Sequence, residues 1–209
     1  MQRGHLLITL GLAMLGLAHA RTAGAGPCDD ASALRADLEH ESVRAQHWTL
    51  AWRITYTTLA AAELGVAASG ALGHDNAEAA VVGGVKSALG ALGQWFAPLR
   101  IEVPAPTGDA CADRAALRAA AERTAHDERQ AFWVSHLGGL AVNLAGAVVL
   151  AQQVSWQSGA LSFATGYPLG LLATYTMPRA SWGRVREASW TASVVVGRDH
   201  RALVVAGSF

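Results

Sequence analysis

The sequence has few charged residues, and this shortage excludes several classes of protein. Charged residues make up 15% of the 209 residues, whereas soluble domains usually contain about 25%. Acidic and basic residues number 16 each, so the formal net charge is zero. No basic surface for nucleic acid is therefore expected. Hydrophobic residues make up 52% of the chain, and its mean hydropathy of +0.24 is high for a water-soluble protein.

Cysteines and catalytic signatures are also scarce. Two cysteines without a surrounding histidine framework make a poor zinc site. The segment Gly83-Gly84-Val85-Lys86 lacks the glycine that must precede the lysine of a phosphate-binding loop. His40 and His47 are seven residues apart, whereas zinc on one helical face favours a spacing of four. We therefore expect no catalytic residue, no metal and no cofactor.

The first twenty residues have the pattern of a secretory signal peptide. Arg3 provides the positive start, residues 6–18 form an apolar run, and Ala18-His19-Ala20 matches the cleavage pattern. A run of 13 residues spans about 20 Å, which is short for a membrane helix. The chain is therefore predicted to be exported to the bacterial cell envelope, where Cys28 and Cys111 can form a disulfide.

An internal repeat predicts the organisation of the rest of the chain. At a shift of 83 residues, Cys28 aligns with Cys111, and a shared Leu-Arg pair and a glutamate follow in register. We place repeat 1 at residues 28–99 and repeat 2 at residues 111–179, with a linker at 100–110. Each repeat reads as a polar helix followed by a hairpin of two apolar helices.

The predicted fold is therefore all-α, a duplicated helical hairpin forming a four-helix bundle. Polar helices are expected near 30–46 and 112–130, and apolar helices near 48–72, 77–98, 131–152 and 157–178. Residues 185–209 read as a small C-terminal β-hairpin, because two β-prone runs flank Gly197-Arg198-Asp199-His200.

The apolar helices favour insertion into a membrane. Residues 131–151 and 157–178 each contain no formal charge, and both are long enough to span a bilayer. Large aromatic residues fall at the helix ends, where interfacial side chains lie: Trp48, Trp52, Trp95, Trp133, Trp156 and Tyr175. A soluble bundle is the alternative, and the distribution of arginine favours the opposite orientation from the one that the signal peptide implies.

Two groups of polar residues lie within the apolar helices. Glu63 and Lys86 have similar predicted depths on either side of a turn, which predicts an intramembrane ion pair. His136, Gly139 and Asn143 share one helical face, which predicts hydrogen bonding between helices or a ligand-facing stripe.

Three functions remain open at the level of sequence. The first is a non-enzymatic membrane scaffold that binds lipid and assembles with itself or with another envelope protein. The second is a small channel or transporter-like protein with a path between the repeats, lined by Glu63, Lys86, His136 and Asn143. The third is a soluble periplasmic bundle that binds a small ligand or cofactor, for example between His47 and His136.

Overall fold

The chain is described from a computed structural model, which places residues 28, 30–183, 190–196 and 201–207. The described part is mostly helical. The signal peptide predicted for residues 1–20 lies outside the described residues.

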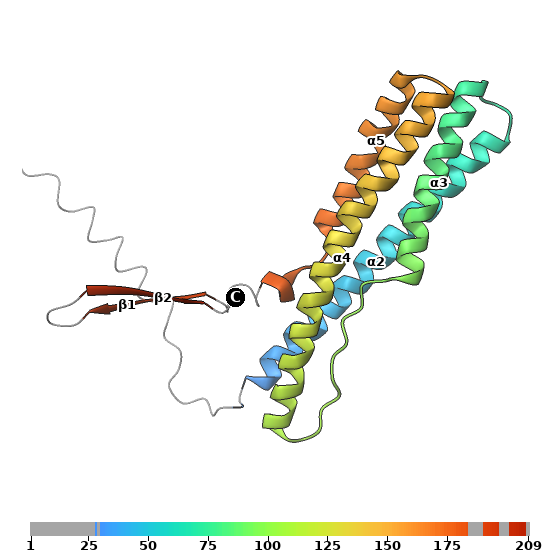
Figure 1. The fold of residues 1–209 in the computed structure, drawn as a ribbon. Helices are drawn as coiled ribbons and strands as arrows, with labels where there is room; N and C mark the ends of the chain where they lie inside the picture. The colour runs from blue at the N-terminus through green and yellow to red at the C-terminus, as the bar shows by residue number, and fades with distance from the viewer. Residues whose placement is uncertain (1–27, 29, 184–189, 197–200, 208–209) are drawn as a thin grey trace, which may run out of the picture.

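Four helices form two antiparallel hairpins (Figure 1). In the first hairpin, α2 (Ala31–Ala68) packs along α3 (His74–Phe96). In the second, α4 (Ala110–Gln153) packs along α5 (Trp156–Thr176). Contacts between the hairpins are sparser and run mainly from α4 to α2 and α3.

The predicted polar helices are not separate elements. Each continues into the apolar helix that follows it, so that α2 has 38 residues and α4 has 44. No glycine or proline occurs in α2 before Gly65 or in α4 before Gly138, so nothing in the sequence interrupts either helix at the change in polarity. At 1.5 Å per residue the two helices are about 57 and 66 Å long.

Two strands follow the helices. β1 (Trp190–Val196) pairs with β2 (Arg201–Gly207) in antiparallel register, with Trp190 opposite Gly207 and Val196 opposite Arg201. The rest of the predicted tail, at 185–189, 197–200 and 208–209, lies outside the described residues.

The N-terminal parts of α2 and α4 form a two-helix stalk, which we define as residues 31–47, 110–131 and the linker 97–109. Cys28 and Cys111 are joined by a disulfide at its end, with Cα atoms 4.9 Å apart. Asp30 forms an ion pair of 2.6 Å with Arg114. The Asp109 carboxylate caps α4 by accepting the backbone N–H groups of its first turn.

The linker returns along the stalk as an extended segment. The Arg35 guanidinium donates to the Pro104 carbonyl at 2.6 Å, and the Ser42 hydroxyl donates to the Ile101 carbonyl at 3.2 Å. Its apolar side chains close a core between the two helices. The main core residues are Leu38, Ala45, Leu99, Ile101, Leu117, Ala120, Phe132 and Met177.

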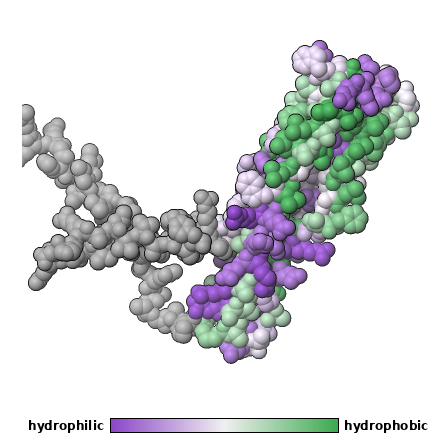
Figure 2. Space-filling view, viewed as in Figure 1, coloured by the Kyte–Doolittle hydropathy of each residue, from purple (hydrophilic) through white to green (hydrophobic). Residues whose placement is uncertain are grey.

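Beyond the stalk lies an apolar half, which we define as residues 48–96 and 132–177. The stalk buries large apolar side chains in its core, whereas this half exposes them. Its buried positions are mostly small or polar, including Ala60, Gly84, Ser87, Ala91, Asn143, Gly146, Gly159 and Thr174. Its large apolar side chains are exposed, as Ile54, Leu144 and Val148 illustrate with exposed fractions of 57%, 48% and 54%. Figure 2 shows hydrophobic residues over much of this half, and hydrophilic ones at its turn end and over the stalk.

Among the described helices, α4 is long and apolar enough to cross a membrane by length and composition. Only 17% of its most apolar 18-residue segment is buried within the protein. The core helix of a soluble protein can meet the same criteria of length and composition, and such a helix is mostly buried. The uncharged α5 does not reach the same hydropathy, because glycine, serine, threonine and tyrosine interrupt its apolar residues.

Candidate functional site

A cavity of about 1130 Å³ lies between the two hairpins and is lined by residues of all four helices. It extends from Asp75 and Asn76 near the first turn to Glu102 and Arg123 at the stalk. Its volume lies slightly above the range of roughly 300–1,000 Å³ that is typical of small-molecule sites. The cavity is therefore the candidate site in the described part of the chain.

Close packing within each hairpin leaves the space between the hairpins open. A Cβ added at Gly90 of α3 would lie 2.9 Å from the Tyr56 ring of α2, so these helices meet where only glycine fits. Gly159 lets α5 approach the backbone of α4 in the same way. On the cavity side, Gly138 and Gly139 have nothing within 4 Å of an added Cβ.

Lys86 crosses from α3 to the second hairpin. Its stem lies against Gly146 of α4, where an added Cβ would be 2.8 Å from Lys86 Cδ. Its ammonium donates to Ser162 Oγ at 2.8 Å and to the Ser162 carbonyl at 3.1 Å, both on α5. A longer bond of 3.4 Å reaches Asn143 Oδ1 on α4. Neutral oxygens of the second hairpin therefore hold the positive charge.

Glu63 stays on the wall of the first hairpin. The Ser87 hydroxyl of α3 donates to Glu63 Oε2 at 2.9 Å. The carboxylate also lies against Gly83, where an added Cβ would be 2.7 Å from Glu63 Oε1. Glu63 and Lys86 both line the cavity, and Ser87 places the carboxylate at the depth of the lysine.

The two charges thus share a cavity but have different hydrogen-bond partners. The salt bridges within 4 Å among the described residues join Glu41 to His40 and Arg44, and Asp30 to Arg114 and Arg118. Glu63 and Lys86 are not among them. Both residues therefore line the cavity without forming a salt bridge to each other.

The predicted polar face of α4 divides into two environments. Asn143 is buried in the cavity wall, where its amide also donates to the Gly139 carbonyl at 2.8 Å. His136 does not line the cavity. It stacks on Phe132 and meets Tyr175 edge-on, with ring centroids 6.0 and 6.2 Å apart. Asn143 lies between Lys86 of α3 and Gly166 of α5, whereas His136 meets Tyr175 at the end of α5.

The predicted interfacial aromatic residues lie at two levels. Trp48 and Trp52 both approach Thr176 Oγ1 at the stalk end of the apolar half, each with an Nε1–Oγ1 distance of 3.3 Å. The Arg53 guanidinium lies 4.1 Å from the Trp95 ring centre.

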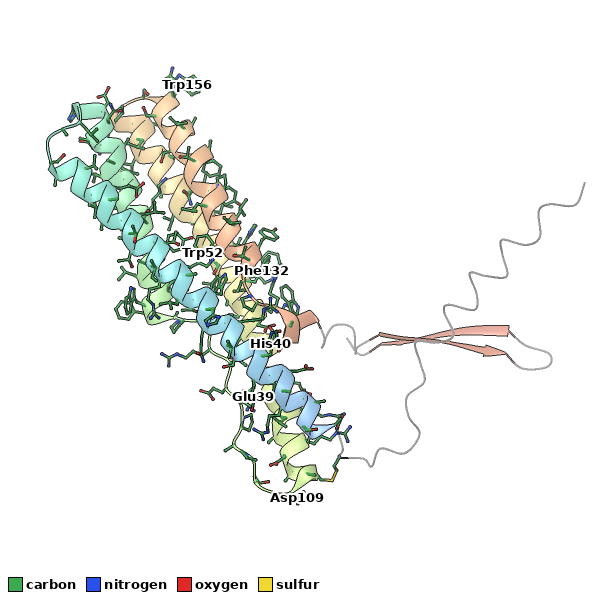
Figure 3. The ribbon with its side chains drawn as sticks, turned by 180° about the vertical axis from the view of Figure 1, so that it is seen from behind. Glu39, His40, Trp52, Asp109, Phe132 and Trp156 are labelled. Carbon is green, nitrogen blue, oxygen red and sulfur yellow. A yellow bond between two sulfur atoms is a disulfide. The ribbon has the colours of Figure 1, made fainter. Side chains whose placement is uncertain are left out.

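The second hairpin completes this arrangement. Trp133 and Tyr175 flank Phe132 at the stalk end. Trp156, 70% exposed, lies at the opposite end, by the turns (Figure 3).

Sequence reasoning missed the residues that hold the two charges, Ser87 and Ser162. Both are small hydroxyl residues in apolar helices, where hydroxyl groups commonly bond the backbone of their own helix. The sequence did contain one indication. Ser162 and Gly166 are four residues apart on α5, which places a hydroxyl group and a position without a side chain on the same helical face.

The described residues contain no candidate metal site, and the chain matches no known family. No cluster of three or more histidine, cysteine, aspartate or glutamate residues suited to a metal occurs in the described part of the chain. Comparison with protein-family models, curated proteins and solved structures finds no match for this chain.

Proposed function

We propose that this chain is an exported membrane protein of the bacterial cell envelope whose transmembrane four-helix bundle surrounds a path for small polar solutes. The cavity carries the proposal. It connects the turn end to the stalk, and Glu63, Lys86, Asn143 and Ser162 all contribute to its wall. Charged residues at this depth of a bilayer cost roughly 2.5–3.5 kcal/mol each on insertion scales, so they usually mark an ion or substrate pathway.

The distribution of side chains supports a membrane location. In water, exposed Ile54, Leu144 and Val148 would leave a large apolar surface unburied, whereas soluble monomers rarely expose contiguous apolar patches beyond a few hundred Å². In lipid the same side chains are solvated, and small residues are the ones that bring helices together. The stalk, with its own apolar core and charged surface, has the composition of a water-exposed segment.

The two aromatic levels fit the thickness of a bilayer. From Trp156 to Tyr175, α5 has about 20 residues, which rise about 29 Å. From Trp133 to Gln153, α4 rises about 30 Å. The hydrocarbon core is about 30 Å thick. The disulfide supports a stalk on the oxidising, exported side.

A non-enzymatic scaffold is the second candidate, favoured by the apolar outer surface. A scaffold function would not require the cavity, nor the separate hydrogen-bond partners of Glu63 and Lys86. A scaffold is expected to keep its function when both charges are neutralised, whereas a solute path is expected to lose transport.

The first experiment is carbonate extraction of the full chain from the host envelope, with thiol labelling before and after reduction. Resistance to extraction, with cysteines that label only after reduction, is the expected result. Release in soluble form would overturn the membrane location and, with it, the placement of Glu63 and Lys86 within a bilayer.

The second experiment measures osmotic volume recovery of vesicles containing the purified protein, in glycerol, potassium acetate and glycine. Wild-type vesicles are expected to recover faster than protein-free vesicles in at least one of these solutes. Gly139→Phe fills the cavity and should return the rate toward that of protein-free vesicles.

Gly65→Phe is the matched control. Gly65 is exposed on α2, does not line the cavity, and also has nothing within 4 Å of an added Cβ. Its variant should keep the wild-type rate. If wild-type vesicles recover no faster than protein-free ones in all three solutes, there is no solute path, and the scaffold becomes the better proposal.

A further inference from the structure

Two opposite charges, one on each wall, define the middle of the cavity. Between the aromatic level at the stalk and the residues that begin α3, the apolar halves of the described helices contain Glu63 and Lys86 as their formal charges. The apolar segments of α4 and α5 contain none. The middle of the cavity therefore carries one positive and one negative charge, while the other charged lining residues lie toward its two ends.

Each charge is held without being neutralised by a contact. Lys86 donates to uncharged oxygens of Ser162 and Asn143, and Glu63 accepts from the uncharged hydroxyl of Ser87. Ser162 Oγ accepts from Lys86, and no described residue accepts its own proton. On one side of the cavity, Lys86 and Ser162 therefore provide a cation and a hydroxyl donor. On the other side, Glu63 provides a hydrogen-bond acceptor.

A solute with a single charge gains from one wall and is repelled by the other. A solute with an anionic group and an ammonium group gains from both, provided that it lies across the cavity. Such a solute loses hydration when it enters the cavity. Its attraction to both charged side chains offsets this cost, because a low dielectric constant strengthens each attraction.

From this arrangement we propose that the cavity binds a small zwitterion, whose anionic group faces Lys86 and Ser162 and whose ammonium group faces Glu63. The inference rests on the proposed function and adds the class of solute. A free amino acid and an ethanolamine phosphate headgroup share this chemistry, and the test below separates them.

The test is competitive binding of labelled glycine to the full chain in phosphatidylglycerol nanodiscs, which contain no zwitterionic lipid. Glycine is compared with acetate and methylammonium, which each carry one of its two charged groups. We expect glycine to bind about ten-fold more tightly or better than either. O-phosphoethanolamine is the second probe, and stronger competition by it than by unlabelled glycine would indicate a phosphate headgroup as the anionic partner.

Charge variants give a readout that a merely structural role would not produce. Glu63→Gln should weaken glycine binding about ten-fold without weakening acetate binding, and Lys86→Gln should weaken glycine binding without weakening methylammonium binding. Glu78→Gln is the matched control, because Glu78 lies on α3 but does not line the cavity. It should bind glycine as the wild type does.

Ser162→Ala keeps both charges and covers the case in which Lys86→Gln fails to fold. It should weaken glycine several-fold, because the wall loses a hydroxyl donor. Equal binding of glycine, acetate and methylammonium, or no glycine or phosphoethanolamine binding at all, would overturn the inference. The proposed function would still stand if the vesicles showed solute flux blocked by Gly139→Phe, so the two failures are distinguishable.

Discussion

Replacing Gly166 with alanine adds one methyl group and tests whether the Lys86 ammonium packs against α5 at this position. An added Cβ at Gly166 falls 2.8 Å from Lys86 Nζ and overlaps Asn143 Oδ1, whereas an ordinary contact begins at 3.4 Å. The ammonium must therefore recede by the difference, 0.6 Å, unless α5 moves. Its bond to Asn143 is already 3.4 Å long, so it has little room to lengthen.

The size of the effect follows from this geometry. Overpacking a close contact costs about 1–3 kcal/mol, and a hydrogen bond to a charged group contributes about 1.5–3 kcal/mol. Alanine regains about 1 kcal/mol over glycine in a helix. Gly170→Ala has the same propensity gain, but its Cβ would lie 4.0 Å from Asn143 Nδ2, an ordinary contact. The gain in helix propensity is the same in both variants and cancels when they are compared. We therefore expect Gly166→Ala to be less stable than Gly170→Ala by about 2–3 kcal/mol.

The assay is denaturant unfolding of the purified full chain in detergent, with both variants measured beside the wild type. The expected order of stability is Gly170→Ala, then wild type, then Gly166→Ala. Equal stability of the two variants, or a Gly166→Ala protein more stable than the wild type, would show that Lys86 is not seated against α5.

Three further predictions concern the stalk and the hairpins. The Cys28–Cys111 disulfide spans a separation of 83 residues, so the double serine variant should lose about 4–5 kcal/mol in denaturant unfolding; an unfolding midpoint unchanged by reduction would contradict this. Hydrogen bonds from Thr107 hold the pKa of Asp113 below its ordinary value of 3.8, so their stabilisation is present above that pH and lost as pH falls below it. The stabilities of the wild type and Asp113→Asn should therefore converge on acidification, and parallel pH profiles would refute the assignment. Gly159→Ala places a methyl group against the backbone of α4, which side-chain rotation cannot relieve, so it should cost about 1–3 kcal/mol in the same unfolding assay.

Local patterns in the sequence predicted several features at specific positions. Gly73-His74-Asp75-Asn76 was expected to separate helices near 48–72 and 77–98, and a turn does lie there, but α2 ends at Ala68 and α3 already begins at His74. Cys28 and Cys111 were paired by their equivalent places in the repeat, and they are joined by a disulfide. The repeat itself stays a prediction. The boundary between polar and apolar helices was wrong, because polarity alone does not end a helix when neither glycine nor proline interrupts it.

The tertiary structure decided what no spacing along one helix reveals. The distances of Glu63 and Lys86 from the turn predicted that they lie at a similar depth. Only the packing of the four helices determines that the Lys86 side chain lies against Gly146 and reaches Ser162. His136 and Asn143 share a face of α4, yet they have different surroundings because the neighbours of α4 change along its length. Periodicity fixes the face on which a side chain lies, whereas the partner that it meets depends on which helices pack there and how closely their glycines let them approach.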